Sequence, residues 1–184
     1  MSDEEKACYS YVDKVCFYKA DFASGLRFPV YPFVRELFSY LHLALAQLVP
    51  NSWRILVSCM VVWMSTNDGD VIRKDKFLHF YRLRKSKDPG YYEFKLWDRA
   101  SRLILDYPSS LRKWKPNLFF IFGSDWEFVL SEDLDEAPKF FHSWGVPMSG
   151  ASFLSFQLFF PFFMTDDDRW LTGTLVLRFP SILV

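Results

Sequence analysis

Three adjacent aspartates, Asp166, Asp167 and Asp168, are the residues of this chain whose type and spacing come nearest to metal chemistry. Nucleases and strand-transfer enzymes hold two divalent metals about 3.5–4 Å apart with carboxylates. Adjacent residues of a strand alternate between its faces, so these three could touch one hard cation but do not form a spaced catalytic set. We expect a solvated acidic turn here, and a metal-dependent nuclease or strand-transfer enzyme is the least favoured function.

The histidines and cysteines do not complete a site either. His42, His79 and His142 lie far apart, and the three cysteines form no CxxC pair. Zinc sites need such ligands at short, regular spacing. The chain also lacks a Gly-rich phosphate loop and a nucleophile elbow. The sequence therefore predicts no enzyme, no metal and no cofactor, and we expect Cys59, which has apolar neighbours, to be a core residue.

Basic side chains are concentrated in the middle of the chain. Residues 71–115 carry 13 Lys and Arg against 5 Asp and Glu, whereas residues 116–184 carry 3 against 9 and the whole chain is neutral. Lys and Arg can neutralise phosphates, and exposed aromatic rings beside them can stack on bases. The alternatives are a solvated rim over core aromatics, or pairing with the acidic end of the chain. The candidate nucleic-acid-binding positions are Arg73, Lys74, Lys76, Arg82, Arg84, Lys85, Lys87, Arg112, Lys113 and Lys115.

Two helices are expected to begin at Pro32 and Pro50, because proline suits a first helical position, where its missing N–H costs nothing. Apolar residues follow each proline at helical spacing, and the turn formers of residues 65–69 end the second helix. We expect plain helix packing rather than a DNA-reading helix-turn-helix, because the second helix offers few polar side chains. Its predicted core-facing stripe is Trp53, Leu56, Val57, Met60, Val61 and Met64.

The rest of the chain predicts a small antiparallel sheet beside these helices, an α+β fold with an N-terminal helical hairpin or bundle and an irregular hydrophobic C-terminal segment. A truncated or mispredicted coding region would explain the abrupt apolar end. The expected elements are a third helix over 71–83, a charged loop over 84–90, and strands at 91–97, 103–105 and 118–122. The expected divisions are a polar leader over 1–20, a domain over 21–140 and a hydrophobic extension over 141–184.

Three groups of residues carry a resemblance to a known family. They are 25–29 with 32–35, then 45–48 with 50–54, and then 91–94, 108–110, 114–115, 119–120 and 126–127. In this order they resemble a plant retroelement-derived domain family labelled "putative transposase, gypsy type", over about residues 20–130. The resemblance implies the gag-side region of a gypsy-like retrotransposon and no catalytic residue. The chain departs from the family pattern after about residue 140.

The function that the sequence favours is a non-catalytic, retrotransposon-derived assembly or scaffold domain. Residues 25–63 and 140–184 would supply apolar surfaces for self-association or for a protein partner. The alternative is a nucleic-acid-binding module that uses the basic middle, and a degenerate relic without a selected function stays open. The polar N-terminus is no secretory signal, and no apolar run approaches the roughly 20 residues that span a membrane. We therefore expect a soluble protein of the cytoplasm or nucleus.

Overall fold

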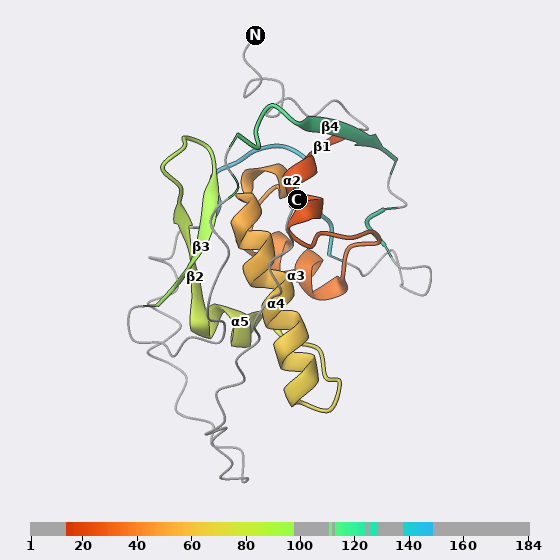
Figure 1. Cartoon of the computed structure of the whole chain (residues 1–184), viewed down its shortest axis with the longest axis vertical. Coiled ribbons are helices and arrows are strands. Elements are labelled where there is room, and N and C mark those ends of the chain that lie inside the picture. Colours follow the sequence, from red (N-terminus) through yellow and green to blue (C-terminus); the bar gives the residue numbers. More distant parts are fainter. Residues whose placement is uncertain (1–13, 98–110, 112, 124–125, 129–137, 149–184) are drawn as a thin grey trace.

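The computed structural model describes residues 14–97, 111, 113–123, 126–128 and 138–148 (Figure 1). The predicted α+β class is confirmed. Helices α3 and α4 lie at the centre, with the β2–β3 hairpin on one side and the β1–β4 ribbon at one end. In chain order the elements are β1 (Lys14–Tyr18), α2 (Lys19–Ala23), α3 (Pro32–Leu41), the 3-10 helix η1 (Leu45–Gln47), α4 (Pro50–Thr66), α5 (Lys74–Phe80), β2 (Tyr81–Lys85), β3 (Tyr92–Leu96) and β4 (Leu118–Phe122).

Helices α3 and α4 begin at Pro32 and Pro50, as the sequence predicts. The predicted stripe of α4 is correct at Trp53, Leu56 and Met60, which are buried. It is wrong at its far end, where Val61 and Met64 are 50% and 41% exposed. The reason is visible in Figure 1, where the C-terminal end of α4 projects from the body of the domain. None of the helices in the described ranges is long and apolar enough to cross a membrane.

The predicted third helix is shorter than expected. Helix α5 ends at Phe80, and Tyr81 begins strand β2, which also includes Arg84 and Lys85 from the predicted loop. Tyr81 stacks on Phe77 at 5.2 Å, and β2 pairs with β3 in antiparallel register. This pairing outweighs the local helical pattern, because it lets apolar side chains of β2 enter the core.

In the part of the chain that the structure describes, the strands form two separate two-stranded ribbons rather than one sheet. Strand β4, predicted at 118–122, pairs with β1 and places Phe17 opposite Phe119. Strand β1 belongs to the predicted polar leader, of which the structure describes residues 14–20. Its residues Val15 to Tyr18 are all buried, so the folded unit includes this end of the leader. The predicted strand at 103–105 lies outside the described residues.

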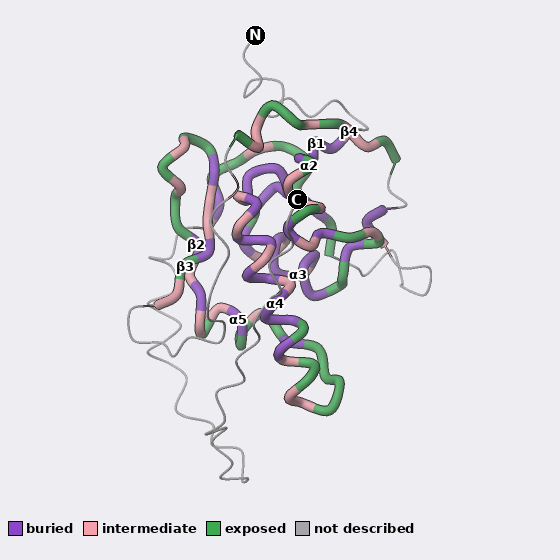
Figure 2. Tube along the Cα trace, in the orientation of Figure 1, coloured by how far each residue is buried: buried purple, intermediate pink, exposed green. Residues whose placement is uncertain are grey.

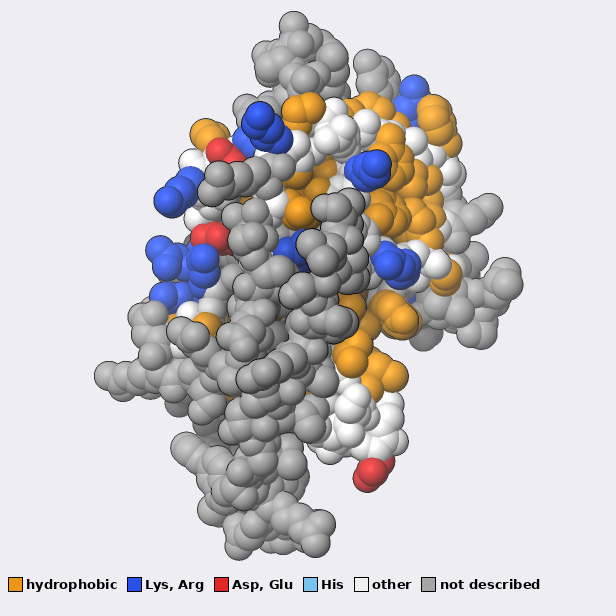
Figure 3. All heavy atoms as spheres, in the orientation of Figure 1, with side chains coloured by type: hydrophobic (Ala, Val, Ile, Leu, Met, Phe, Trp, Pro, Cys, Tyr) orange, Lys and Arg blue, Asp and Glu red, His pale blue; other side chains and the backbone are white. Residues whose placement is uncertain are grey.

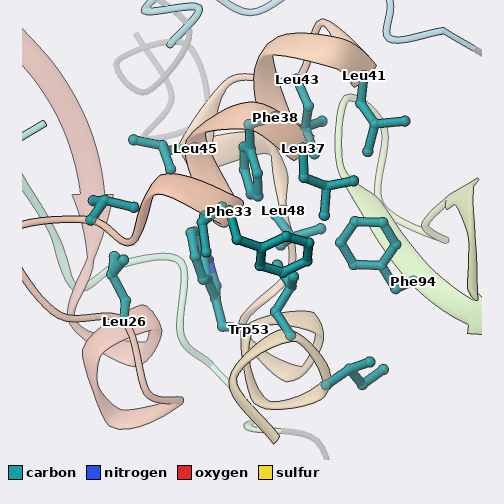
Figure 4. Close-up of a cluster of buried hydrophobic side chains, with 14 of the residues drawn as sticks. Leu26, Phe33, Leu37, Phe38, Leu41, Leu43, Leu45, Leu48, Trp53 and Phe94 are labelled. Carbon is teal, nitrogen blue, oxygen red and sulfur yellow. The ribbon is translucent and has the colours of Figure 1, made fainter. Parts of the chain in front are cut away.

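The core explains where the apolar residues of 25–63 go. Phe38 stacks on Trp53 at 5.2 Å between α3 and α4 (Figure 4), and both rings are buried. Phe94 of β3 reaches the same cluster, and its backbone N–H donates to Ser52 Oγ at 2.9 Å. Figure 2 shows that most of this stretch is buried. Most apolar side chains of residues 25–63 therefore form the domain's own core rather than the exposed surface that the sequence predicted; Tyr31 and Val61, at 53% and 50% exposure, are exceptions.

Residues 138–148, which we call the C-terminal strap, pack along this core. Phe140 stacks on Trp126 at 5.8 Å and meets Phe38 edge-on at 6.0 Å. Gln47 Nε2 donates to the carbonyl of Gly145 at 2.9 Å, and the N–H of Met148 donates to the carbonyl of Leu41 at 3.0 Å. The predicted boundary between residues 140 and 141 thus falls inside the strap.

Candidate functional surfaces

Within the described ranges, the structure brings together no group of three His, Cys, Asp or Glu side chains that could hold a metal ion. Burial raises the pKa of Cys59 to about 12, and Cys16 is buried as well, so neither thiol is set up as a nucleophile. Asp166, Asp167 and Asp168 lie outside the described residues. Two surfaces formed by the described residues are candidates for binding, one basic and one aromatic.

The basic surface lies on the outer side of the β2–β3 hairpin. Tyr81, Leu83 and Phe94 point into the core, so the alternate residues point outward. Arg82 is opposite Lys95 in the register, and Arg84 is opposite Glu93. Figure 3 shows Lys and Arg side chains gathered where Figure 1 places this hairpin, with acidic side chains among them.

A second basic segment reaches the tip of this hairpin. Lys115 Nζ lies 3.4 Å from a carboxylate oxygen of Asp88 and 4.7 Å from the centre of the Tyr91 ring. The contact brings Lys113 and Lys115 beside a loop that precedes them by more than twenty residues, and Arg112 lies outside the described residues. We call the resulting set the basic hairpin surface: Arg82, Arg84, Lys85, Lys87, Lys95, Lys113 and Lys115.

Lys95 is the member that the sequence did not single out. Lys95 lies opposite Arg82 in the hairpin. A prediction that residues 81–85 pair antiparallel with residues 92–96 would have placed Lys95 beside the other basic residues. Lys95 also lies 3.3 Å from Glu93, so one acidic residue of the hairpin is partly neutralised by its own strand.

The other predicted basic positions lie on α5 or directly before it, away from the hairpin tip. Arg73 pairs with Asp75 at 3.5 Å, and Lys74 pairs with Glu36 of α3. Lys76 is exposed on the same short helix. Because α5 runs directly into the start of β2, these residues are at the opposite end of the hairpin from Asp88. The structure therefore divides the predicted set into two groups.

The aromatic rings near the basic residues are engaged within the domain. Trp114 packs edge-on against Tyr18 at 4.6 Å and Tyr91 at 5.1 Å. The hydroxyls of Tyr18 and Tyr91 are 2.8 Å apart. Trp97 donates its indole N–H to the carbonyl of Leu78 at 3.0 Å, while the Arg82 guanidinium lies over its ring at 4.9 Å. These rings hold the hairpin and the 113–115 segment in place.

The aromatic surface lies on β4. Phe119 and Phe122 are 39% and 65% exposed, although the strand contains only apolar residues. Phe119 lies 5.6 Å from Phe22, whose ring is 5.1 Å from Phe28. Figure 3 shows apolar side chains collected on the side of the molecule where Figure 1 places α2 and the β1–β4 ribbon. We call Phe22, Phe28, Phe119 and Phe122 the aromatic edge; the sequence predicted the strand but not its exposure.

With this geometry in view, comparison with known proteins decides one point. Residues 15–85 match the family model described as "Putative gypsy type transposon". The resemblance seen in the sequence is thereby confirmed over this segment, and its third group of residues lies beyond the match. No curated protein and no solved structure matches the chain.

The gypsy-type segment runs from β1 into β2, and residues outside it complete its core. Arg35 of α3 is buried, donates a hydrogen bond to the Glu127 carbonyl, and lies over the Phe128 ring at 4.7 Å. The Glu127 side chain is also buried and lies 2.7 Å from His142 Nε2 of the C-terminal strap. The gypsy-type segment therefore folds here as part of a larger unit.

The contact between His142 and Glu127 predicts a pH dependence of stability. The hydrogen bond to Glu127 raises the pKa of His142 above its usual value, with partial burial opposing the shift. A raised histidine pKa stabilises the fold fully below the unfolded-state pKa, and this contribution is lost as the pH rises through the folded-state pKa. The His142 side chain is 39% exposed, so we expect about 1 kcal/mol or less.

The measurement is urea unfolding of the wild type and of His142→Asn at a series of pH values from acidic to alkaline. The stability difference between them should be largest in acid and shrink through neutral pH. His79→Asn, a change at an exposed histidine of α5, is the control and should give a difference that does not follow this course. A pH-independent difference for His142→Asn would show that the ring contributes packing alone.

Proposed function

We propose that this gypsy-type domain is a non-catalytic assembly module that pairs with a second copy of itself through strand β4. The observation that carries the proposal is the sequence LFFIF of β4, which has no charge and no proline, at the outer side of the ribbon. Among the described residues β4 pairs with β1 alone. Natural edge strands normally carry a Lys, a Pro or a bulge that prevents pairing with another chain, and β4 carries none.

The packing of the ribbon supports the same proposal. Phe119 and Ile121 face the cluster around Phe17, whereas Leu118 and Phe120 face the cluster around Tyr18. A strand that is apolar on both faces is typical of the interior of a sheet. An added strand would give β4 that environment, with backbone hydrogen bonds for affinity and aromatic side chains for specificity.

A second copy is the simplest partner. Two identical strands can pair antiparallel about a two-fold axis, so that the same patch of each copy meets the other. Because β4 has no charged side chain, such a pairing brings no like charges face to face within the strand. Most apolar residues of α3 and α4 are buried in the core, so the assembly surface that we propose is the aromatic edge; Val61 and Met64, at the exposed end of α4, serve as the comparison in the test.

The test is sedimentation velocity over a wide range of protein concentrations. The wild type should associate as concentration rises, and the double variant Phe119→Lys/Phe122→Lys should stay monomeric, because two charges then flank the pairing edge. Val61→Lys/Met64→Lys adds the same charge at two exposed apolar positions of α4 and should behave as the wild type. A wild type that is monomeric at every concentration, or equal effects of both variants, would refute the proposal.

A further inference from the structure

Beyond assembly, we infer that the basic hairpin surface binds the phosphate backbone of nucleic acid without reading its bases. Within the described residues of the hairpin and the 113–115 segment, its seven Lys and Arg residues are accompanied by two acidic residues, Glu93 and Asp88, which leaves an excess of five positive charges in these ranges. Arg84, Lys85 and Lys87 are exposed. Among the described residues these three have no ion pair, so their charges face solvent.

The arrangement of these charges suits a charged polymer rather than one small anion. Arg82 and Arg84 are two residues apart on the outward face of β2, a separation of about 6.5–7 Å. Lys95 lies beside them across the ribbon. Lys85 is the next residue of β2 and therefore lies on the other face of the ribbon, where it is exposed near the tip, and Lys87 follows in the tip itself. At the tip the contact between Lys115 and Asp88 adds the 113–115 segment. The positive charge therefore extends along the hairpin, and a phosphate chain could follow it.

The aromatic contacts argue against base recognition. Stacking on bases requires an open ring face. Trp97 has the Arg82 guanidinium over its ring, and Trp114 packs against Tyr18 and Tyr91. Binding at this surface would consequently depend on charge, tolerate any base sequence, and weaken steeply with salt.

A nucleic acid fits this surface better than an anionic membrane does. Membrane-binding surfaces combine basic residues with apolar side chains that insert into the lipid. The exposed large apolar residues, such as Val61 of α4, Phe119 and Phe122, lie on other elements, and those exposed on the hairpin strands are charged. The exposed residues of the hairpin strands can therefore contact phosphates but have no apolar side chain to insert into a lipid bilayer.

The experiment uses the full chain and fluorescence anisotropy of labelled duplex DNA and of single strands with different base compositions, at several salt concentrations. The logarithm of the binding constant should fall linearly with the logarithm of salt concentration, with a slope of about −0.9 for each duplex phosphate neutralised. Arg84→Gln/Lys85→Gln/Lys87→Gln should weaken duplex binding about 10- to 100-fold and reduce the slope by about 2–3. Different base compositions should give similar constants.

The matched control removes the same number of positive charges elsewhere. Arg73→Gln/Lys76→Gln/Lys19→Gln changes three exposed residues, one directly before α5, one on α5 and one on α2. This variant should bind as the wild type does. Circular dichroism and urea midpoints verify that both variants are folded. The inference is overturned if the wild type fails to bind at the lowest salt, or if the control loses as much affinity as the hairpin variant. Equal binding to phosphatidylglycerol vesicles at the same salt would overturn it in favour of a lipid surface.

Discussion

Replacing Trp53 by alanine is expected to lower the free energy of unfolding by about 3–5 kcal/mol, the usual cost of removing a buried tryptophan. The side chain is 1% exposed and lies in the middle of the core, stacked on Phe38. Domains of this size are stable by only about 5–15 kcal/mol, so this loss removes a large part of the stability. Urea or thermal unfolding followed by far-UV circular dichroism measures the loss.

Two further variants serve as comparisons for Trp53→Ala. Met64→Ala, on the exposed end of the same helix, should change stability by about 0.5 kcal/mol or less. Trp53→Phe should cost less than Trp53→Ala, because it keeps a ring against Phe38. It also removes a buried indole N–H that has no hydrogen-bond partner among the described residues. Similar losses for Trp53→Ala and Met64→Ala would mean that α4 does not pack through Trp53.

Phe140→Ala is expected to have the second-largest effect, a loss of about 3 kcal/mol or more. Phe140 is buried between Trp126 and Phe38, so its removal leaves a cavity where the C-terminal strap meets the core. The neighbouring Phe141 is 41% exposed, and Phe141→Ala should cost much less. The pair is compared by urea unfolding at one pH.

The comparison of these two neighbours also tests where the folded unit ends. A large loss at Phe140 with a small loss at Phe141 means that the strap is an integral part of the domain. Equal, small losses would mean that the unit ends before residue 138 and that the strap lies on it loosely. The match to the gypsy-type family ends at residue 85, so this test concerns the part of the unit that the match does not cover.

The features that could be predicted from the sequence are those that neighbouring residues determine. Pro32 and Pro50 fix the helix starts, and the apolar spacing after them identifies the buried face of α3 and the first half of α4. The exposure of the C-terminal end of α4 could not be predicted. The helical spacing of apolar residues continues through Val61 and Met64, but the rest of the domain does not extend alongside them. The length of α5 likewise depends on the pairing of β2 with β3.

Long-range pairing accounts for the rest. Strand β1 was hidden in an apparently polar leader because its partner, β4, follows it by about one hundred residues. The basic residues can all be read in the sequence, but it takes the contacts of Lys115 with Asp88 and of Trp114 with Tyr91 to bring two of the segments together, while α5 stays apart. The apolar residues of 25–63 are evident in the sequence. The sequence alone does not distinguish apolar side chains that form the core from those that form a binding surface, and most of these are in the core.

The pairing of β1 with β4 also bears on synthesis. A ribosome adds about 5–20 residues per second, so roughly 5–20 s pass between the appearance of β1 and that of its partner. During this time β1, whose residues Val15, Phe17 and Tyr18 are buried in the folded domain, lacks its partner strand β4. The hairpin of β2 and β3 can form much earlier, from residues that are close in the chain. The β1–β4 ribbon therefore cannot form until residues 118–122 have been made, when the β2–β3 hairpin is already available.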